Sequence, residues 1–333
     1  MTPQPKTVRI GLMGTSGWSE FMYLTALHDD PRVELSAIAG RNPGKLEDVA
    51  DKWGIPNRFA DAHELIASDL DAVIVASPDS SHAEYAIAAL QAGKHVLCEK
   101  PLAMTTEQSE RMLAAAESSG LTNMVMFTFR FLPFIQQLRR EVAELGQITD
   151  ARFEFRQGYA RNDDYIWRLD PAHATGVIGD LGSHVFDLAH WILGDFEIAS
   201  ASSNNLFHPA LDTNEQFTAM AKLADGGAVT FVTSMIDEMG DTDMEQLFEF
   251  QSTTAKLSFR AIYSGPRAGI HIERRSAGES TFVSELGLQA PFYPAGPRSF
   301  VSAILGESAE TPDFKDGHRA QQHIAKTLEL SAL

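Results

Sequence analysis

The feature that most constrains the fold is a regular alternation of short apolar runs with helical segments between Val8 and Phe129. The apolar runs read VRIGLM, VELSAIAG, DAVIVASP, HVLCEKP and NMVMFTF, and between them lie PGKLEDVADKWG, SHAEYAIAALQAG and TTEQSERMLAAAESSG. Continuous apolar strands separated by amphipathic helices are typical of a parallel sheet covered on both faces. The pattern predicts a doubly wound α/β domain over residues 1–127.

After Thr128 the pattern changes to β-like runs with little helix between them. These runs are TDARFEFRQG, EIASASSNN, EQFTAMAKLADGGAVTFVTSMI, QLFEFQSTTAKLSFRA and GIHIERRS, and the segments ADGGA and STTAK are typical of hairpin turns. We expect a second α/β domain over residues 128–333 with a mostly antiparallel sheet. A helix over residues 180–193 and helices near the C terminus should pack on that sheet, and RRSAGEST and QAPFYPAGP are predicted loops.

The net charge narrows the class of partner. A formal charge of −18 over 333 residues argues against a nucleic acid or an anionic membrane as the main partner, because both would be repelled. The first residues, MTPQPKT, contain no apolar signal-peptide core, so a cytoplasmic protein is expected. Cys98 is the single cysteine, which fits a reducing compartment and excludes a cysteine zinc cluster.

The first strand leads into a glycine-rich turn, GLMGTSGWSE, that opens a helix. Such a turn lets phosphate oxygens approach backbone N–H groups at a positive helix end. In the usual G-x-G-x-x-G spacing, Ser16 and Ser19 replace two of the three glycines, so a tight turn that binds nothing remains the alternative. The residues predicted to contact a dinucleotide here are Gly11, Gly14, Thr15, Ser16, Gly17 and Trp18.

The end of the second strand, AIAGRNPGK, bears on the choice of dinucleotide. A carboxylate at this point would hold the ribose hydroxyls of NAD and repel a 2'-phosphate, but the chain has Gly40 followed by Arg41. Arg41 and Asn42 are therefore predicted to contact the cofactor, with NADP preferred and NAD possible. The alternatives are an arginine that is exposed to solvent or that stacks on adenine in either cofactor.

Several motifs taken together resemble one family. GLMGTSGW, DAVIVASPDSSH, HVLCEKPLA, FTFRFLP, GVIGDLGSHVFDLAHWILG and FKDGHRAQ follow in the order found in the glucose-fructose oxidoreductase, inositol dehydrogenase and MocA-like (Gfo/Idh/MocA) family. The resemblance implies an NAD(P)-binding Rossmann domain and a C-terminal domain whose large open sheet often forms the oligomer interface. It also implies a homodimer or homotetramer that oxidises or reduces a hydroxyl or carbonyl of a sugar, polyol or related ring.

The resemblance assigns a catalytic role to Lys100, just past the end of a parallel strand. In the family this lysine reaches the substrate hydroxyl, and the peptide to Pro101 is tight and often cis. A lysine partly desolvated by a nicotinamide ring can take part in proton transfer. Glu99 is expected to anchor the turn or contact the cofactor, and Lys100 and Pro101 are predicted cofactor contacts. A surface lysine in a turn is the alternative.

The segment GDLGSHVFDLAHWIL supplies the second part of the predicted site. On a helix, Asp180, His184 and Asp187 share one stripe beside an apolar stripe. With the family pattern, His184 is the main acid/base candidate, and Asp180 orients it or binds the substrate. The alternatives are a capping carboxylate for Asp180 and a core histidine for His184. A divalent metal on this stripe is possible in principle, but none is expected.

Other residues have weaker signals. Ser77, Pro78 and His82 resemble family positions near the cofactor, although a histidine at a helix start is equally plausible. Arg130 in FTFRFLP is predicted to reach the cofactor or substrate, with a salt bridge at the edge of the core as the alternative. The polar-aromatic loop GYARNDDYIWR suits a sugar ring, and Tyr159, Trp167 and Arg168 are its predicted substrate contacts, with packing as the alternative for each.

These residues predict an NAD(P)-dependent oxidoreductase that transfers a hydride between nicotinamide and a carbinol or carbonyl carbon of a polyhydroxylated substrate. Two alternatives stay open. One is a glycosidase-like enzyme in which tightly held NAD oxidises a ring carbon transiently. The other is a non-catalytic sensor of a sugar or dinucleotide on the same scaffold. The substrate itself depends on loop shapes that the sequence does not determine.

Overall fold

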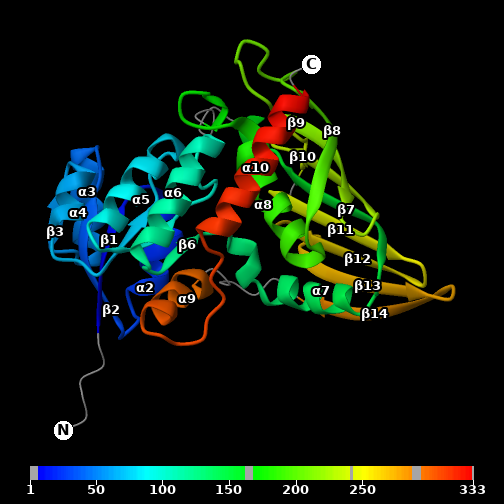
Figure 1. Cartoon of the computed structure of the whole chain (residues 1–333), viewed down its shortest axis with the longest axis horizontal. Helices are drawn as coiled ribbons and strands as arrows, with labels where there is room; N and C mark the ends of the chain where they lie inside the picture. The colour runs from blue at the N-terminus through cyan, green and yellow to red at the C-terminus, as the bar shows by residue number, and fades with distance from the viewer. Residues whose placement is uncertain (1–6, 162–167, 241–242, 287–293, 332–333) are drawn as a thin grey trace, which may run out of the picture. The chain divides into compact units, whose positions relative to one another are not determined.

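The computed structural model describes residues 7–161, 168–240, 243–286 and 294–331. Packing divides the chain into two units (Figure 1). The first comprises Met1–Phe131 with Pro291–His318, and the second comprises Leu132–Ala290 with Arg319–Leu333. The sequence predicts a single crossing after residue 127, whereas the chain crosses after Phe131 and later returns to the first unit.

A parallel sheet with strand order β3-β2-β1-β4-β5-β6 forms the centre of the first unit. Its strands are β1 (Val8–Met13), β2 (Val33–Ala39), β3 (Asn57–Phe59), β4 (Ala72–Val75), β5 (His95–Cys98) and β6 (Asn123–Val125). The order reverses at β1, which pairs with both β2 and β4. This is the doubly wound sheet predicted from the sequence, and ligands bind at the carboxyl edge of such sheets where the order reverses.

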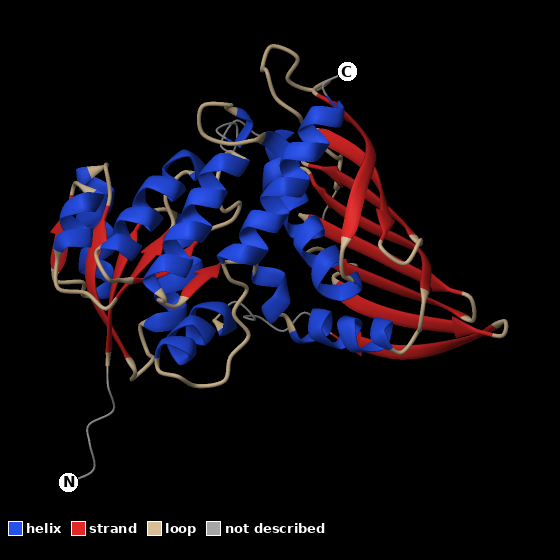
Figure 2. Ribbon diagram, viewed as in Figure 1, coloured by secondary structure: helices blue, strands red, loops and turns tan. Residues whose placement is uncertain are grey.

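Helices cover both faces of this sheet (Figure 2). They are α1 (Gly17–Ser19), continued by a π-helical turn (Glu20–Leu24) and α2 (Thr25–Leu27), then α3 (Pro43–Trp53), α4 (Ala62–Ala67), α5 (His82–Gln91), α6 (Thr106–Ser119) and α9 (Ala295–Ile304). Helix α3 has clear boundaries in the sequence: the Asn42 side chain accepts a hydrogen bond from the Lys45 N–H, and Gly54 ends the helix at φ 66°. Phe300 and Val301 of α9 join the core around Ile10 and Leu12.

The second unit is built on an eight-stranded sheet of order β14-β13-β12-β11-β7-β10-β9-β8. Its strands are β7 (Ile148–Gln157), β8 (Phe196–Asn204), β9 (Gln216–Leu223), β10 (Ala228–Ser234), β11 (Met244–Ser252), β12 (Ala255–Ile262), β13 (Gly269–Ser276) and β14 (Glu279–Leu286). Only the β7–β10 pair is parallel among them, so the mostly antiparallel prediction is confirmed.

Helices lie against one face of this sheet, and the other face stays uncovered in the described unit (Figure 2). Helix α8 (Gly176–Leu193) packs on β7, β9 and β10, and α7 (Pro133–Ala143) packs on β12. Phe153, Phe231 and Phe248 point to the helix side, where their rings meet at centroid distances of 5.0 and 5.8 Å. Helix α10 (Phe314–Ser331) continues from the first unit into the second.

Three local predictions are corrected. RRSAGEST is a hairpin and not a loop, because Ala277 (φ 51°) and Gly278 (φ 83°) make a tight turn between β13 and β14. The sequence signal is weak since alanine rarely adopts positive φ. The last residues of QAPFYPAGP begin α9 at Ala295, and residues 287–293 lie outside the described part. Helix α8 begins at Gly176, four residues before the predicted start.

Among the described helices, none has the length and apolarity to cross a membrane.

Candidate functional site

The turn after β1 has the geometry of a phosphate cradle. Gly14 has φ +141°, and a Cβ there would lie 2.4 Å from the Ala76 carbonyl oxygen, so only glycine fits. Ser16 caps the following helix by accepting a hydrogen bond from the Ser19 N–H at 3.1 Å. A Cβ on Gly17 would meet no atom within 4 Å, which leaves the backbone bare at the helix start. These residues fit a dinucleotide phosphate.

Gly11, also predicted to touch the cofactor, lies within β1. A Cβ at this position would lie 2.6 Å from Leu70 Cδ1 and 2.8 Å from Leu65 Cδ2. Close packing of the sheet against these two leucines is therefore sufficient reason for a glycine here.

Gly40, and not an acidic residue, follows β2, and the Thr15 side chain occupies the space next to Gly40. A Cβ on Gly40 would lie 2.5 Å from Thr15 Cγ2, so a side chain at position 40 requires Thr15 to move. Arg41 is exposed next to this point. The Asn42 side-chain oxygen caps α3, as described above, and the NH₂ group of the same side chain is a hydrogen-bond donor.

Glu99 connects the end of β5 to the glycine-rich turn. Its Oε1 atom accepts hydrogen bonds from Trp18 Nε1 at 2.6 Å and from Tyr23 Oη at 2.7 Å. Its Oε2 atom accepts a hydrogen bond from the Lys100 N–H at 3.2 Å. Burial and the nearby Glu99 carboxylate raise the pKa of Tyr23 well above its ordinary value, so the phenol remains a donor. The peptide to Pro101 is cis, as expected.

The loop after β4 reaches the same edge of the sheet. Ser77 Oγ lies 2.7 Å from Ser81 Oγ, and the Ser81 hydroxyl donates to the Pro78 carbonyl at 2.7 Å. His82 at the start of α5 is completely buried. Its Nδ1 lies 2.9 Å from the Pro101 carbonyl oxygen and its Nε2 lies 2.9 Å from the Ser77 carbonyl oxygen.

Arg130 has the salt bridge that was the alternative to cofactor contact. The side chain is 4% exposed, and Nη1 lies 3.2 Å from Asp316 Oδ2 and 3.8 Å from Glu310 Oε1. The guanidinium also lies over the Phe127 ring at 5.9 Å. These contacts stabilise a buried cation, and a cofactor contact by Arg130 stays a prediction.

In the second unit, helix α8 presents Asp180 to two residues of the preceding loop. The Asp180 carboxylate accepts a hydrogen bond from Tyr159 Oη and pairs with Arg168 Nη1 at 2.9 Å. The Arg168 guanidinium also lies over the Tyr159 ring, 5.4 Å from its centroid. Three predicted substrate residues are thus brought together. Trp167, the remaining predicted contact of that loop, lies outside the described residues.

His184 lies one turn after Asp180 and is 8% exposed. Its ring is 6.0 Å from the ring of Phe155 on β7. Asp187, on the same stripe, is buried as well. Among the described residues, no group of three His, Cys, Asp or Glu side chains is arranged to hold a metal ion.

The start of α8 depends on a residue that sequence reasoning missed. Asn214 accepts hydrogen bonds from the Val177 N–H at 3.0 Å and the Ile178 N–H at 2.8 Å. Gly176 has φ +64°, and its Cβ would lie 2.6 Å from the Asn214 carbonyl oxygen. Since the helix starts here, Asp180 is not at its N terminus, and the capping interpretation of Asp180 is wrong. No spacing signal links residues so far apart in sequence.

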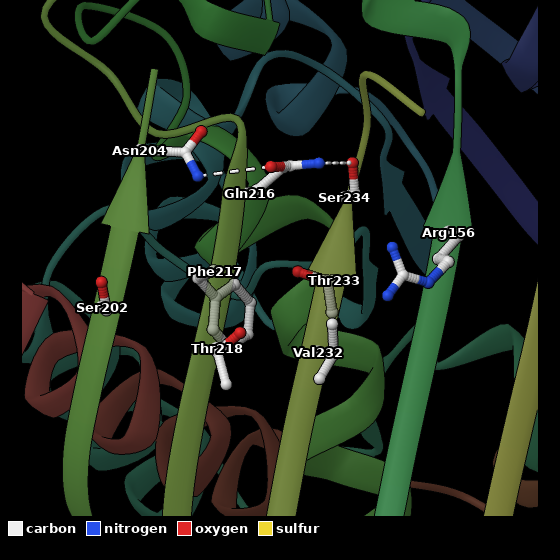
Figure 3. A pocket seen from close by; sticks show the side chains of 9 residues that line it. All are labelled: Arg156, Ser202, Asn204, Gln216, Phe217, Thr218, Val232, Thr233 and Ser234. Atoms are coloured by element: carbon white, nitrogen blue, oxygen red, sulfur yellow. Dashed lines mark hydrogen bonds between the residues drawn. The ribbon is translucent and has the colours of Figure 1, made fainter. Parts of the chain in front are cut away.

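A polar cavity of about 260 Å³ lies on the face of the second sheet opposite α8 (Figure 3). Gln216 Nε2 donates to Ser234 Oγ at 2.9 Å and to Asp237 Oδ1 at 3.0 Å. Arg156 Nη1 pairs with Asp237 Oδ2 at 2.7 Å, so its charge is balanced. Burial favours a raised pKa for Asp237, but hydrogen bonds from Ser234 and Arg156 outweigh it and lower the pKa. None of the predicted site residues lines this cavity.

Comparison with known proteins matches both units. A model described as "Oxidoreductase family, NAD-binding Rossmann fold" matches residues 8–127, and a "GFO/IDH/MocA C-terminal domain" model matches residues 135–258. Glucose-6-phosphate 3-dehydrogenase of Bacillus subtilis is 31% identical over 343 residues, covering 96% of this chain and 95% of that protein. Levoglucosan dehydrogenase of Pseudarthrobacter phenanthrenivorans is 35% identical over 170 residues, covering 49% of this chain but only 44% of that protein.

A solved structure of levoglucosan dehydrogenase, in complex with NADH and L-sorbose, has a similar fold. It is 24% identical, with a TM-score of 0.87, covering 98% of this chain and 97% of that chain. At this identity the likeness shows the fold alone.

Proposed function

The chain belongs to the Gfo/Idh/MocA oxidoreductase family, and on that premise we propose that it transfers a hydride between NAD(P) and a hydroxyl or carbonyl carbon of a sugar or polyol. Relatives of the chain are named as sugar and inositol dehydrogenases. The chain is thus an NAD(P)-dependent oxidoreductase for sugar-like substrates. The relatives named here act on different sugars and inositol, so the proposal names the substrate class and not one sugar.

The observation that carries the proposal is the hydrogen-bonded Glu99. Its carboxylate accepts hydrogen bonds from Trp18 and Tyr23, which lie at and just after the glycine-rich turn. Because Glu99 directly precedes Lys100, these bonds hold the backbone of the lysine at that turn. Ligands of open α/β sheets bind at this carboxyl edge. A lysine fixed at the dinucleotide turn is well placed to act on a hydroxyl next to a bound nicotinamide.

In the proposed reaction each side chain has a stated task, and bound NAD(P) supplies the hydride chemistry. Lys100 donates a hydrogen bond to the substrate oxygen and stabilises negative charge on it. His184 takes the hydroxyl proton in the oxidative direction and returns it in the reductive direction. Asp180, balanced by Arg168 and Tyr159, positions substrate hydroxyls near that imidazole.

We further propose a preference for NADP. This preference rests on the residues of this chain and not on the solved neighbour described above, which contains NADH. Gly40 supplies no carboxylate, and Thr15 fills the space next to it, so a 2'-phosphate meets no negative charge there. Arg41 is exposed at the same point and can donate paired hydrogen bonds to that phosphate.

The proposal includes a homodimer or homotetramer formed through the open sheet and a cytoplasmic location. Side chains along β9 point alternately to the two faces of the sheet, and Thr218, Met220 and Lys222 are exposed on the face that no helix covers. Met220 is 52% exposed on this face, and a second copy packed against the sheet would bury it. Cys98 is free and buried, which is compatible with a reducing compartment.

The proposed function is tested with a panel of sugars, polyols and their keto forms, run with NAD(H) and NADP(H) and followed by nicotinamide absorbance. We expect substrate-dependent oxidation or reduction of the cofactor. Lys100→Met should lower kcat by about 10²- to 10⁴-fold with little change in cofactor binding, whereas Lys52→Met, at an exposed ion pair with Glu20, should not. Sugar turnover without net cofactor change would indicate the glycosidase-like chemistry instead, and binding without turnover would indicate a sensor.

A further inference from the structure

His82 is held between two backbone carbonyl groups and has no exposed surface. Nδ1 and Nε2 each lie 2.9 Å from a carbonyl oxygen, of Pro101 and Ser77 respectively. A carbonyl oxygen can only accept, so each ring nitrogen must donate. A neutral imidazole has one N–H, so its second nitrogen would face a carbonyl lone pair and could accept only from the neighbouring Cys98 thiol. Both contacts are satisfied only by the doubly protonated ring.

The groups facing His82 favour the positive charge. Burial alone would lower the pKa of His82, but the nearby Cys98 sulfur, the Asp79 carboxylate and the Pro101 carbonyl raise it to about 10. Asp79 belongs to the loop after β4, and Cys98 is the last residue of β5. The surroundings on both elements therefore act in the same direction as the hydrogen-bond geometry.

We propose that His82 is a positioning residue for Lys100. As an imidazolium ion, His82 bridges the Ser77 and Pro101 carbonyl groups and so holds the backbone that carries the lysine. This inference rests on the proposed role of Lys100. Pro101 is the next residue along the chain, so fixing its carbonyl to the loop after β4 fixes the backbone that carries the lysine. Glu99 holds the other side of the same backbone through the Lys100 N–H. His82 has no exposed surface that a cofactor could touch, so it acts through Lys100 and not on the cofactor.

The charge state is tested first by ¹⁵N NMR of the full-length protein with labelled histidine. We expect two protonated ring nitrogens on His82 at pH 8, where an ordinary histidine is neutral. His82→Gln provides the assignment by loss of the signal, and the exposed His63, bonded to Glu84, provides a reference ring. One protonated nitrogen at pH 8 would overturn the imidazolium bridge, whatever the activity of the enzyme.

The positioning role is tested by kinetics of His82→Gln, whose amide oxygen cannot donate to the second carbonyl. We expect kcat to fall about 10- to 100-fold, because small misplacements of a catalytic group are costly, while the Kd of NADP is unchanged. His63→Gln should match the wild type. In a Lys100→Met background, His82→Gln should cause no further loss.

The outcomes separate this inference from the proposed function. A weaker Kd for NADP with unchanged kcat would make His82 a cofactor contact, and a lower thermal midpoint with unchanged kcat would make it merely structural; either overturns the inference. An additional loss of kcat in the Lys100→Met background would also overturn it. If Lys100→Met itself keeps full activity, the role of the lysine fails, and the NMR result still decides the charge state.

Discussion

At the scale of single residues, the candidate site is marked by charges buried with their partners. Isolated charges are expensive to bury, and they persist where hydrogen bonds or opposite charges compensate them. Glu99 is 7% exposed and accepts from an indole, a phenol and a backbone N–H, and Asp180 is 6% exposed beside Arg168. The sequence predicted both residues, but apart from the adjacent Lys100 N–H their partners come from positions that no spacing rule relates.

For the acid/base residue, we expect His184→Asn to retain the fold and to lose the ionisation that controls kcat/KM near neutral pH, because asparagine cannot exchange a proton there. The measurement is the pH profile of kcat/KM for the best substrate. His190→Asn is the matched control, since His190 lies on the same helix but pairs with Asp195 at 2.8 Å. An unchanged rate and profile in His184→Asn would move the proton transfer to another residue.

For the cofactor residue, we expect Arg41→Ala to raise the KM for NADP by roughly tenfold or more and to leave the KM for NAD nearly unchanged. A charge-assisted contact to a phosphate contributes about 1.5 to 3 kcal/mol, and NAD lacks that phosphate. Michaelis constants for both cofactors in wild type and variant decide the matter. Equal losses would mean that Arg41 stacks on adenine, and a wild type that prefers NAD would contradict the prediction outright.

At the scale of elements, strongly patterned segments were predicted well and contact-dependent ones were not. VRIGLM and the AVIV part of DAVIVASP are mostly apolar runs, and both form parallel strands that are buried except at Arg9. The short β3 (Asn57–Phe59) and α4 (Ala62–Ala67) were missed, because three to six residues carry too little periodicity. The early start of α8 was missed since its cap, Asn214, is supplied from elsewhere in the chain.

The start of α8 supplies an element-scale prediction. Gly176→Ala should lower the free energy of unfolding by more than about 2 kcal/mol, because alanine is strained at positive φ and its Cβ would collide with a backbone oxygen. Gly120→Ala is the control: Gly120 has the same φ of 64° but open space around it, so it should cost only about 1 kcal/mol. Urea unfolding measures both. Equal costs would show that the Asn214 contact relaxes freely.

Helix α10 supplies a pH-dependent prediction. Burial, reinforced by His190 and Arg319, lowers the pKa of His323 from 6.5 to about 4, and its ring stacks on Phe196 at 4.1 Å. Because the unfolded chain binds this proton more readily, stability should fall as the pH drops from 6.5 towards 4. His323→Phe keeps the stacking and should reduce this slope, as measured by urea unfolding at several pH values. His63→Phe should keep the full slope, and an unaltered slope in His323→Phe would refute the assignment.

At the scale of the whole molecule, the open sheet predicts self-association. Met220→Lys places a charge on the exposed face of β9 and should shift the protein towards monomer in analytical ultracentrifugation, because the interface would have to bury that charge. Leu206→Lys is the control, since Leu206 is 79% exposed but lies in the loop after β8. If wild type is already monomeric, or if Met220→Lys keeps the wild-type size, the sheet face is not the interface.

The return of the chain to its first unit affects how that unit can form during synthesis. The Val125 N–H donates to the Pro312 carbonyl at 2.8 Å, and the Phe314 N–H donates to Asn123 Oδ1 at 2.8 Å, so the edge strand β6 is bordered by residues made almost two hundred positions later. Phe300 is fully buried in the same core. A ribosome therefore has to finish the whole second sheet, which ends with β14 at Leu286, before the first unit has all of its parts. A gene fragment ending near residue 131 would leave apolar surface around β6 exposed to other nascent chains.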